Sequence, residues 1–235
     1  MPETTPEILV IDIGGTSVKL WHTTHQDHRK FESGKELTPE AMVAGVQESA
    51  REWTYQAIAL GLPCRVSAGR AVEEPQNLGA GWMGFNFSAA FGLPARILND
   101  ACLQALGSYD GGRMLFLGLG TAVGSALIAD RLVLSLDLGR IHVGAERVFE
   151  ILGDQGAERL GAKKWRKGVQ EIVPMLKHAV MADYVVLGGG NAQEMEELPD
   201  GVRRGHNRAV VEGGRRLWAE MPDPAQPATG DWLIL

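Results

Sequence analysis

The sequence predicts an α/β protein of two lobes that face each other across a cleft. Three observations lead to this fold class. The chain has 235 residues, enough for one large or two small hydrophobic cores. Apolar runs of strand length alternate with segments of helical periodicity. This succession occurs twice, and in each half a glycine-rich turn joins the first two of three adjacent strands.

The first half begins with short runs that are apolar or that alternate between apolar and polar residues. The strands expected from them cover 7–13, 17–24, 29–34 and 56–62. A helix is expected from Pro39 to about Trp53, because proline is favourable in a first helical turn and apolar residues recur there at helical spacing. Residues 67–92 are rich in glycine and proline, which predicts loops.

The second half repeats the pattern. Strands are expected at 95–98, 114–120, 123–130, 131–136 and 182–190, and helices at 99–109, 145–152, 163–181 and 207–220. We expect residues 1–98 to form an N-terminal lobe that helix 207–220 completes, and residues 99–206 to form a C-terminal lobe. Residues 221–235 form a tail whose proline-rich part, 221–230, is expected to be loose, while Trp232 and Leu233 could dock.

Composition excludes several classes of partner. Lys and Arg number 23 against 29 Asp and Glu, a net charge of −6, which argues against nucleic acid or an anionic membrane as a partner. The two cysteines, Cys64 and Cys102, form no metal-type pair, which favours a reducing compartment. The N-terminus lacks the features of a signal peptide, and no apolar stretch reaches membrane-spanning length. We therefore expect a cytoplasmic protein.

The first glycine-rich turn has the residue types of a phosphate-binding loop. Residues 11–19 read IDIGGTSVK, with an aspartate at a strand end, a turn of small residues and a lysine on the returning strand: Asp12, Gly14, Gly15, Thr16 and Lys19. Glycines let backbone N–H groups approach phosphate oxygens, and a carboxylate suits Mg²⁺, held directly or through water. The alternative is an ordinary hairpin with a glycine turn.

Two further glycine clusters follow. Residues 116–128 repeat the strand–turn–strand arrangement with Gly118, Gly120 and Thr121. Residues 185–192 end a strand in three glycines, Gly188, Gly189 and Gly190, which suits a base or ribose lying against bare backbone, or an anion at a helix N-terminus. The alternative for this third cluster is a close crossing between a helix and a strand.

The order of DIGGTxxK, NDA, LGLGTxxGSAL and VVLGGGNA resembles the ROK sugar kinases of the actin/hexokinase/Hsp70 superfamily, over about residues 8–220. Within that family the chain is most similar to the short polyphosphate/ATP glucokinases. The resemblance implies a two-lobed, actin-like ATPase fold of the ribonuclease H-like type. It also implies Mg²⁺, ATP or polyphosphate as phosphoryl donor, a hexose as acceptor, and a homodimer.

The resemblance also assigns roles to single residues. Asp100 would be the general base that takes the proton from the attacking sugar hydroxyl, and Asn99 would hold a neighbouring hydroxyl. Asn77 would be another hydroxyl ligand, with Trp82 packed beneath it. The alternative for the Asn-Asp pair is a helix N-cap, where both residue types are common.

The chain departs from the family after the second glycine turn. Where the family carries Glu-x-x-His, this sequence has Asp137 and Arg140, and we expect Arg140 to pair with Asp137 or to face a negative group. An anionic or differently substituted sugar, or a lost activity, would each explain the change. Glu150 is the nearest candidate for a further pocket glutamate and Glu146 the second. The family's zinc motif is missing, so no structural zinc is expected.

These observations predict a sugar kinase. A non-catalytic sugar or nucleotide sensor on the same fold is the alternative, and a kinase for another small metabolite, such as pantothenate, fits the DIGGT motif less well. The sequence leaves the sugar and the choice between ATP and polyphosphate open.

Overall fold

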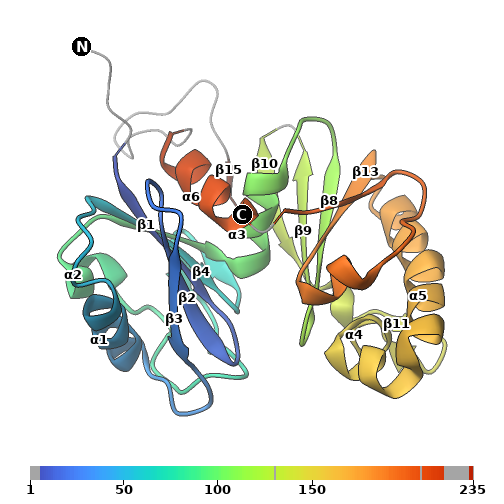
Figure 1. Ribbon diagram of the computed structural model, residues 1–235, viewed down its shortest axis with the longest axis horizontal. Coiled ribbons are helices and arrows are strands. Elements are labelled where there is room, and N and C mark those ends of the chain that lie inside the picture. Colours follow the sequence, from blue (N-terminus) through green and yellow to red (C-terminus); the bar gives the residue numbers. More distant parts are fainter. Residues whose placement is uncertain (1–5, 130, 207, 220–232, 235) are drawn as a thin grey trace.

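The computed structural model describes residues 6–129, 131–206, 208–219 and 233–234. Two mixed sheets stand on either side of a central pair of helices, α3 (Asp100–Ser108) and α6 (Ala209–Ala219), and further helices cover the outer faces (Figure 1). This arrangement confirms the predicted two-lobed α/β fold. In the part of the chain that the structure describes, no helix is both long and apolar enough to span a membrane.

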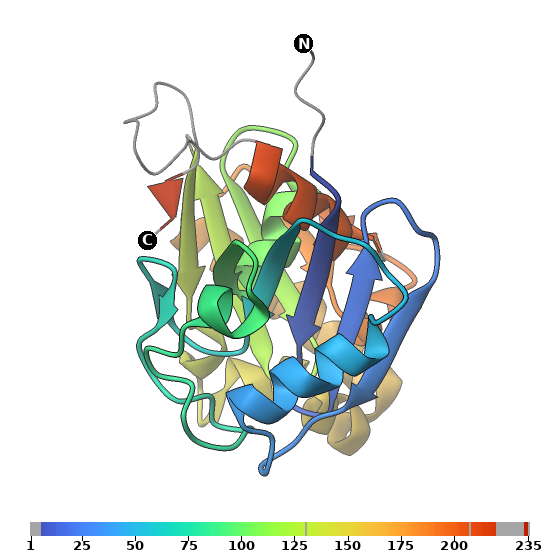
Figure 2. The same ribbon diagram turned by 90° about the vertical axis from the view of Figure 1, so that its left-hand side faces the viewer.

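The first sheet has the order β3-β2-β1-β4-β7. Its strands are β1 (Ile8–Ile13), β2 (Ser17–His22), β3 (His28–Glu32), β4 (Ala57–Leu62) and β7 (Ala95–Asn99). Helices α1 (Pro39–Ser49) and α2 (Phe87–Phe91) lie on the outer side, and Figure 2 shows α1 crossing in front of the sheet. The pairing β1–β2 is antiparallel, whereas β1–β4 and β4–β7 are parallel.

Alternation along β1 decides which residues face the site. Leu9 and Ile11 belong to the core under α1, whereas Ile8 and Val10 belong to the core that includes α3 and α6. Side chains on a strand alternate between its two faces. Asp12 therefore follows Val10 on the face that is turned toward α3.

The second sheet has the order β14-β13-β8-β9-β10-β15. Its strands are β8 (Met114–Leu119), β9 (Val123–Ala129), β10 (Leu132–Leu136), β13 (Tyr184–Gly188), β14 (Val202–Arg204) and β15 (Leu233–Ile234). Helices α4 (Val148–Leu152) and α5 (Asp154–Ala179) cover its outer face. Met114 and Phe116 face the central helices, while Leu115 and Leu117 pack under α5.

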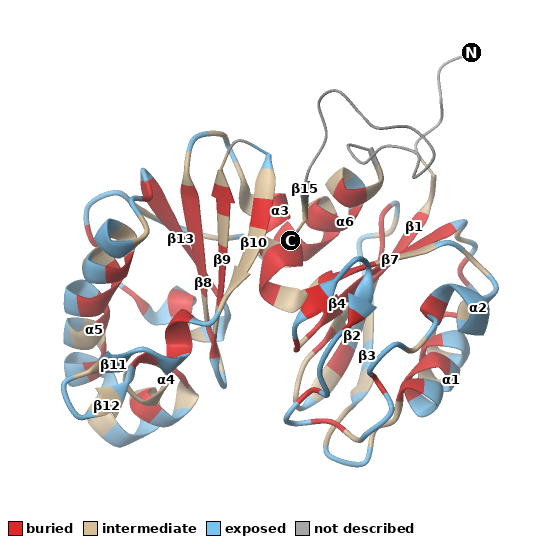
Figure 3. Ribbon diagram, turned by 180° about the vertical axis from the view of Figure 1, so that it is seen from behind, coloured by how far each residue is buried: buried red, intermediate tan, exposed pale blue. Residues whose placement is uncertain are grey.

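Glycines allow the central helices to pack unusually closely. A β-carbon on Gly107 of α3 would lie 1.7 Å from the carbonyl oxygen of Ala209, and one on Gly213 of α6 would lie 1.9 Å from that of Leu103. Both distances are far below van der Waals contact, so only glycine fits at these positions. One hydrophobic core contains residues of both sheets and both helices. Much of α3 and α6 is coloured as buried in Figure 3.

Several elements differ from the expected ones. Helix α5 begins at Asp154 rather than at 163, and its backbone leaves helical geometry at Gly161, where φ is +73°. The expected helix near 145–152 is short, because the hairpin β11 (His142–Val143) and β12 (Glu146–Arg147) precedes it. The loop-rich segment holds the small hairpin β5 (Val66–Ser67) and β6 (Arg70–Ala71).

The last described residues, 233–234, form β15 at the edge of the second sheet. Leu233 pairs with Leu132 of β10 in parallel register, so the expected docking of this residue is confirmed. Trp232 and the proline-rich segment 221–230 lie outside the described residues.

Candidate active site

Asp100 lies where β7 runs into α3. The preceding residue, Asn99, caps the helix: its Oδ1 accepts hydrogen bonds from the backbone N–H groups of Ala101 (3.0 Å) and Cys102 (3.3 Å). Its Nδ2 donates to the carbonyl oxygens of Cys64 (3.2 Å) and Leu62 (3.4 Å). Because these bonds use the amide's donors and acceptors, the structure favours the capping role for Asn99 over the expected role as a sugar ligand.

The carboxyl groups of Asp12 and Asp100 are half-buried and repel each other electrostatically. Desolvation and the negative charge of Asp12 together raise the pKa of Asp100 to about 7, while the hydrogen bond from the N–H of Ala101 (2.8 Å) opposes the shift. Burial also raises the pKa of Asp12 to about 6, and Lys19, its cross-strand partner on β2, lowers it. Asp100 is therefore close to half-ionised at neutral pH, which suits a group that accepts and releases a proton.

Two glycines bring strands of both sheets against the first turn of α3. A β-carbon on Gly61 at the end of β4 would lie 3.2 Å from Cα of Asp100. A β-carbon on Gly124 of β9 would lie 3.2 Å from Cβ of Ala101. Because β9 directly follows the second glycine turn, the first turn of α3 lies next to elements of both lobes. The structure thereby brings Asp100 together with the end of β1 and the start of β9.

The first glycine turn is a tight hairpin connection. The N–H of Gly14 donates to the carbonyl oxygen of Ser17 (2.9 Å), and the hydroxyl of Ser33 donates to the carbonyl oxygen of Gly14 (2.6 Å). Thr16 is exposed at its tip. Asn77 lies beside the turn, since a β-carbon on Gly15 would be 3.3 Å from Cβ of Asn77. The structure thus places the expected sugar ligand Asn77 next to the expected phosphate turn.

Trp82 is fully buried and packs against Phe87, as expected for a residue that supports the loop. The carboxylate of Glu74 accepts hydrogen bonds from the backbone N–H groups of Trp82 (3.0 Å) and Met83 (3.3 Å). Glu74 therefore fixes the glycine-rich loop from outside, a contact that the sequence did not indicate.

Close packing requires glycine at two of the three positions in the third glycine cluster. A β-carbon on Gly188 would lie 2.4 Å from the ring of Phe116, and one on Gly189, whose φ is +83°, would lie 2.5 Å from the carbonyl oxygen of Leu119. The close approach to β8 therefore requires both. Gly190 has open space around it, so packing does not account for this glycine.

One functional candidate was missed in the sequence. Asp154 at the start of α5 accepts a hydrogen bond from the hydroxyl of Thr121 in the second glycine turn (3.1 Å) and one from the side-chain amide of Asn191 after the third cluster (2.8 Å). Its backbone N–H donates to the carbonyl oxygen of Gly120 (2.9 Å). The one sequence signal for Asp154 was an aspartate directly after Gly153, a residue type that is common at the start of a helix. That signal can be recognised only when α5 is known to begin at this position.

The residues that replace the family's Glu-x-x-His lie on the surface. Arg140 and Asp137 form an ion pair of 2.9 Å, as expected, and their side chains are 54% and 70% exposed. Glu150 accepts a hydrogen bond from the N–H of Arg147 (2.7 Å) and so caps α4.

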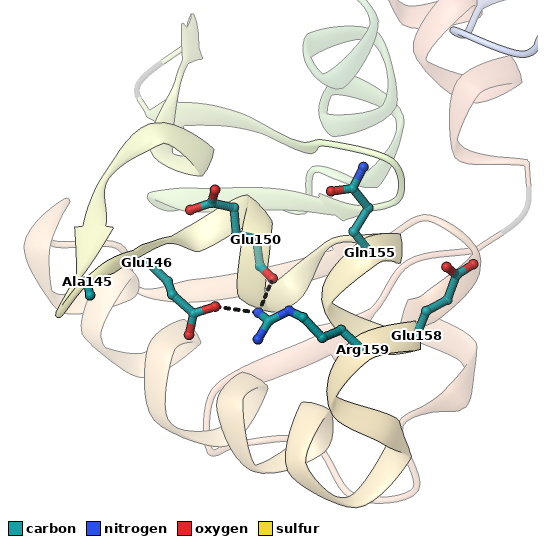
Figure 4. A pocket seen from close by; sticks show the side chains of 6 residues that line it. All are labelled: Ala145, Glu146, Glu150, Gln155, Glu158 and Arg159. Atoms are coloured by element: carbon teal, nitrogen blue, oxygen red, sulfur yellow. Dashed lines mark hydrogen bonds and ion pairs between the residues drawn. The ribbon is translucent and has the colours of Figure 1, made fainter.

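Glu146 pairs with Arg159. Glu146 and Glu150 line a hollow of about 620 Å³ at α4 and the start of α5 (Figure 4), together with Ala145, Gln155, Glu158 and Arg159. Glu150 thus serves the local structure, and its role as a sugar ligand stays a prediction.

Asp12 suits a divalent cation, because its half-buried carboxyl group interacts with a second carboxyl group, that of Asp100, whose negative charge a cation would offset. Among the described residues, no group of three or more His, Cys, Asp or Glu could hold a metal ion. A Mg²⁺ ion here would take its remaining ligands from water and phosphate, as this ion commonly does.

Comparison with protein-family models and with curated protein sequences gives no match. Comparison with solved structures does. The inorganic polyphosphate/ATP-glucomannokinase of Arthrobacter sp. strain KM is similar with a TM-score of 0.78 and 19% identity, over 92% of this chain and 99% of that one. The chain has the two-lobed fold of the ROK proteins.

Two further structures show the range of functions on this fold. A ROK family glucokinase from Streptomyces griseus, in complex with glucose and AMPPNP, has a TM-score of 0.69 and 16% identity, over 90% of this chain and 99% of that one. A ROK family transcriptional regulator, a homolog of the E. coli MLC protein, has a TM-score of 0.64 and 13% identity, over 89% and 76%. The expected similarity in fold to ROK structures is confirmed, whereas the fold alone does not decide between kinase and regulator.

Proposed function

We propose that this protein is a sugar kinase, which transfers the terminal phosphoryl group of ATP or polyphosphate to a hydroxyl of a hexose. The observation that carries the proposal is the position of Asp100, half-buried at the start of α3 close enough to Asp12 for the two carboxyl groups to interact, with its pKa raised to about 7. Asn99 caps the helix that begins at Asp100, Gly61 of β4 leaves room for Asp100, and Gly124 of β9 leaves room for Ala101.

In the proposed reaction, Asp100 accepts the proton of the sugar hydroxyl while that oxygen attacks the terminal phosphorus of the donor. The bond from this phosphorus to the bridging oxygen breaks, and the rest of the donor leaves with the electron pair. Positioning and neutralisation of charge supply most of the catalysis in such transfers. Asp12 would hold Mg²⁺, directly or through water, and the ion when bound would neutralise negative charge on the donor phosphates.

The two glycine turns would hold the donor. The backbone N–H groups of Gly15 and Thr121 and the hydroxyl of Thr16 are the phosphate-binding groups in this proposal. Gly14 and Gly120 shape the two turns, because their N–H groups are hydrogen-bonded within them. Gly188, Gly189 and Gly190 would form the shelf for adenosine when ATP is the donor; the open space around Gly190 agrees with a ligand at that point. Asn77, beside Gly15, would hold a sugar hydroxyl near the phosphate chain.

A non-catalytic sensor is the second candidate, and two observations favour it. A transcriptional regulator shares the fold. The Asp137–Arg140 pair replaces the family's Glu-x-x-His and is satisfied within the chain. A sensor would bind sugar or nucleotide without turnover, and its ligand affinity would not depend on the proton-accepting ability of Asp100.

A phosphoryl-transfer assay on the purified protein separates the two candidates. It crosses a panel of hexoses and amino sugars with ATP and with polyphosphate, and runs Asp100→Asn in parallel. Turnover with one sugar that falls by about 100-fold or more in Asp100→Asn supports the kinase. Sugar or nucleotide binding without turnover for any pair would contradict it and favour the sensor.

A further inference from the structure

Asp154 joins two glycine-rich turns that are far apart in the sequence. Its Oδ2 accepts the hydroxyl proton of Thr121, 33 positions earlier, and its Oδ1 accepts a hydrogen bond from Nδ2 of Asn191, 37 positions later. Thr121 lies in the turn between β8 and β9, and Asn191 lies in the short 3-10 helix Gly190–Glu194, which forms the turn after β13. One carboxylate thus holds both turns, and each of its oxygens has a donor.

The backbone around Asp154 is built for this approach. The N–H of Asp154 donates to the carbonyl oxygen of Gly120 at 2.9 Å. A β-carbon on the preceding Gly153 would lie 3.0 Å from the carbonyl oxygen of Gly120 and 3.2 Å from that of Thr121. The start of α5 can therefore lie against the second glycine turn only because residue 153 has no side chain.

The turn after β13 is also held from its other side. The guanidinium of Arg204 on β14 donates to the carbonyl oxygens of Ala192 (3.2 Å) and Met195. Arg204 fixes this turn to its own edge of the sheet, whereas Asp154 is the group that ties it to the second glycine turn. Removing the Asp154 side chain would delete both of its hydrogen bonds and leave the two turns positioned by the sheet and by the packing of Gly189 against Leu119.

We propose that Asp154 is a positioning residue for the phosphoryl donor, because its carboxylate sets the relative position of the two turns across which the donor lies. The inference rests on the proposed function. Asp154 itself does not bind the phosphates, since a carboxylate repels them and its oxygens are already hydrogen-bonded. Its effect is on the donor alone, because the acceptor residue Asn77 lies on the other lobe, beside Gly15.

The test compares Asp154→Ala and Asp154→Asn with a matched control. Asp183 carries out the same kind of task at the opposite end of β8 and β13, where its Oδ2 accepts a hydrogen bond from the N–H of Arg113 (2.7 Å), so Asp183→Asn is the control. The dissociation constants of AMPPNP and of tripolyphosphate, each with Mg²⁺, are measured by calorimetry, along with the KM values for donor and sugar and the melting temperature.

We expect Asp154→Ala to weaken the binding of both donor probes by about tenfold or more, as the loss of two hydrogen bonds predicts. The KM for the sugar should change less than twofold, and Asp154→Asn, which keeps one acceptor oxygen, should lie between Asp154→Ala and the unmodified protein. Thr121→Val combined with Asp154→Ala should weaken binding less than the product of the single effects. The Asp183→Asn variant should bind both probes normally.

Unchanged donor affinity in Asp154→Ala would overturn the inference. An equal loss of affinity for donor and sugar would also overturn it, because it would indicate a merely structural role. Absence of turnover in the unmodified protein would instead contradict the kinase proposal. The calorimetric comparison would still decide the role of Asp154, because it needs binding and not turnover. If the unmodified protein bound neither AMPPNP nor tripolyphosphate, both the kinase proposal and the inference about Asp154 would be overturned.

Discussion

Replacing Asp100 by asparagine should make the protein more stable at alkaline pH. The folded structure raises the pKa of Asp100 from 3.8 to about 7. A raised carboxyl pKa means that the folded state favours the protonated form. The contribution of Asp100 to the free energy of unfolding is therefore fully present below pH 3.8 and is lost as the pH rises through about 7. Asparagine is neutral at every pH and can still accept the hydrogen bond from the N–H of Ala101.

The size of the effect follows from the shift. At about 1.36 kcal/mol per pKa unit, a rise of roughly three units corresponds to about 4 kcal/mol of free energy of unfolding. We therefore expect Asp100→Asn and the unmodified protein to differ little near pH 4, and the variant to be more stable by up to about 4 kcal/mol above pH 7.5. The difference should be smaller in an Asp12→Asn background, because the charge of Asp12 contributes to the shift.

Urea unfolding at half-unit steps from pH 4 to 8.5, followed by tryptophan fluorescence, measures this difference. Asp200→Asn, at an exposed position, is the control and should shift the free energy of unfolding by less than about 0.5 kcal/mol throughout. A pH-independent difference for Asp100→Asn, or a variant less stable than the unmodified protein at pH 8, would refute the burial and coupling of this carboxyl group.

Three further predictions test other parts of the account. Gly213→Ala should lower the free energy of unfolding in urea by about 1–3 kcal/mol or more, because its β-carbon would lie 1.9 Å from the carbonyl oxygen of Leu103. Gly190→Ala, in open space, should lower it by well under that amount. An equal loss of stability in both variants would contradict the close helix contact. Mg²⁺ at pH 8 should raise the melting temperature of the unmodified protein and not that of Asp12→Asn; an equal rise in both would place the ion elsewhere. The double change Asp137→Glu with Arg140→His should alter the free energy of unfolding by less than about 1 kcal/mol, because the ion pair is exposed. It should also lower the KM for glucose in the transfer assay. An unchanged KM would mean that these positions take no part in sugar recognition.

The strands and the glycine turns could be predicted because their signals are local. A buried strand is a short apolar run, and the turn after β1 is marked by Gly14 and Gly15 within the same nine residues. The Asp137–Arg140 pair is local in the same way, since its members are three positions apart. The expected lobe boundaries stay a prediction, because one hydrophobic core joins residues of both sheets through α3 and α6.

What the sequence could not show depends on partners distant along the chain. Asn99 reads equally well as a cap or a ligand until the carbonyl oxygens of Leu62 and Cys64 are seen to occupy its amide. Asp154 has no local sign of its role, because Thr121 and Asn191 come to it from separate turns. The pKa of Asp100 likewise depends on burial and on Asp12, which only the assembled fold supplies.

The pH dependence of kcat/KM for phosphoryl transfer, with and without Asp100→Asn, tests the central proposal most directly. The proposal predicts a rate that falls tenfold per pH unit below about pH 7, as the carboxyl group of Asp100 becomes protonated, and a loss of about 100-fold or more at pH 8 in the asparagine variant. Transfer that persists in Asp100→Asn at the rate of the unmodified protein would contradict the assignment of Asp100 as the base.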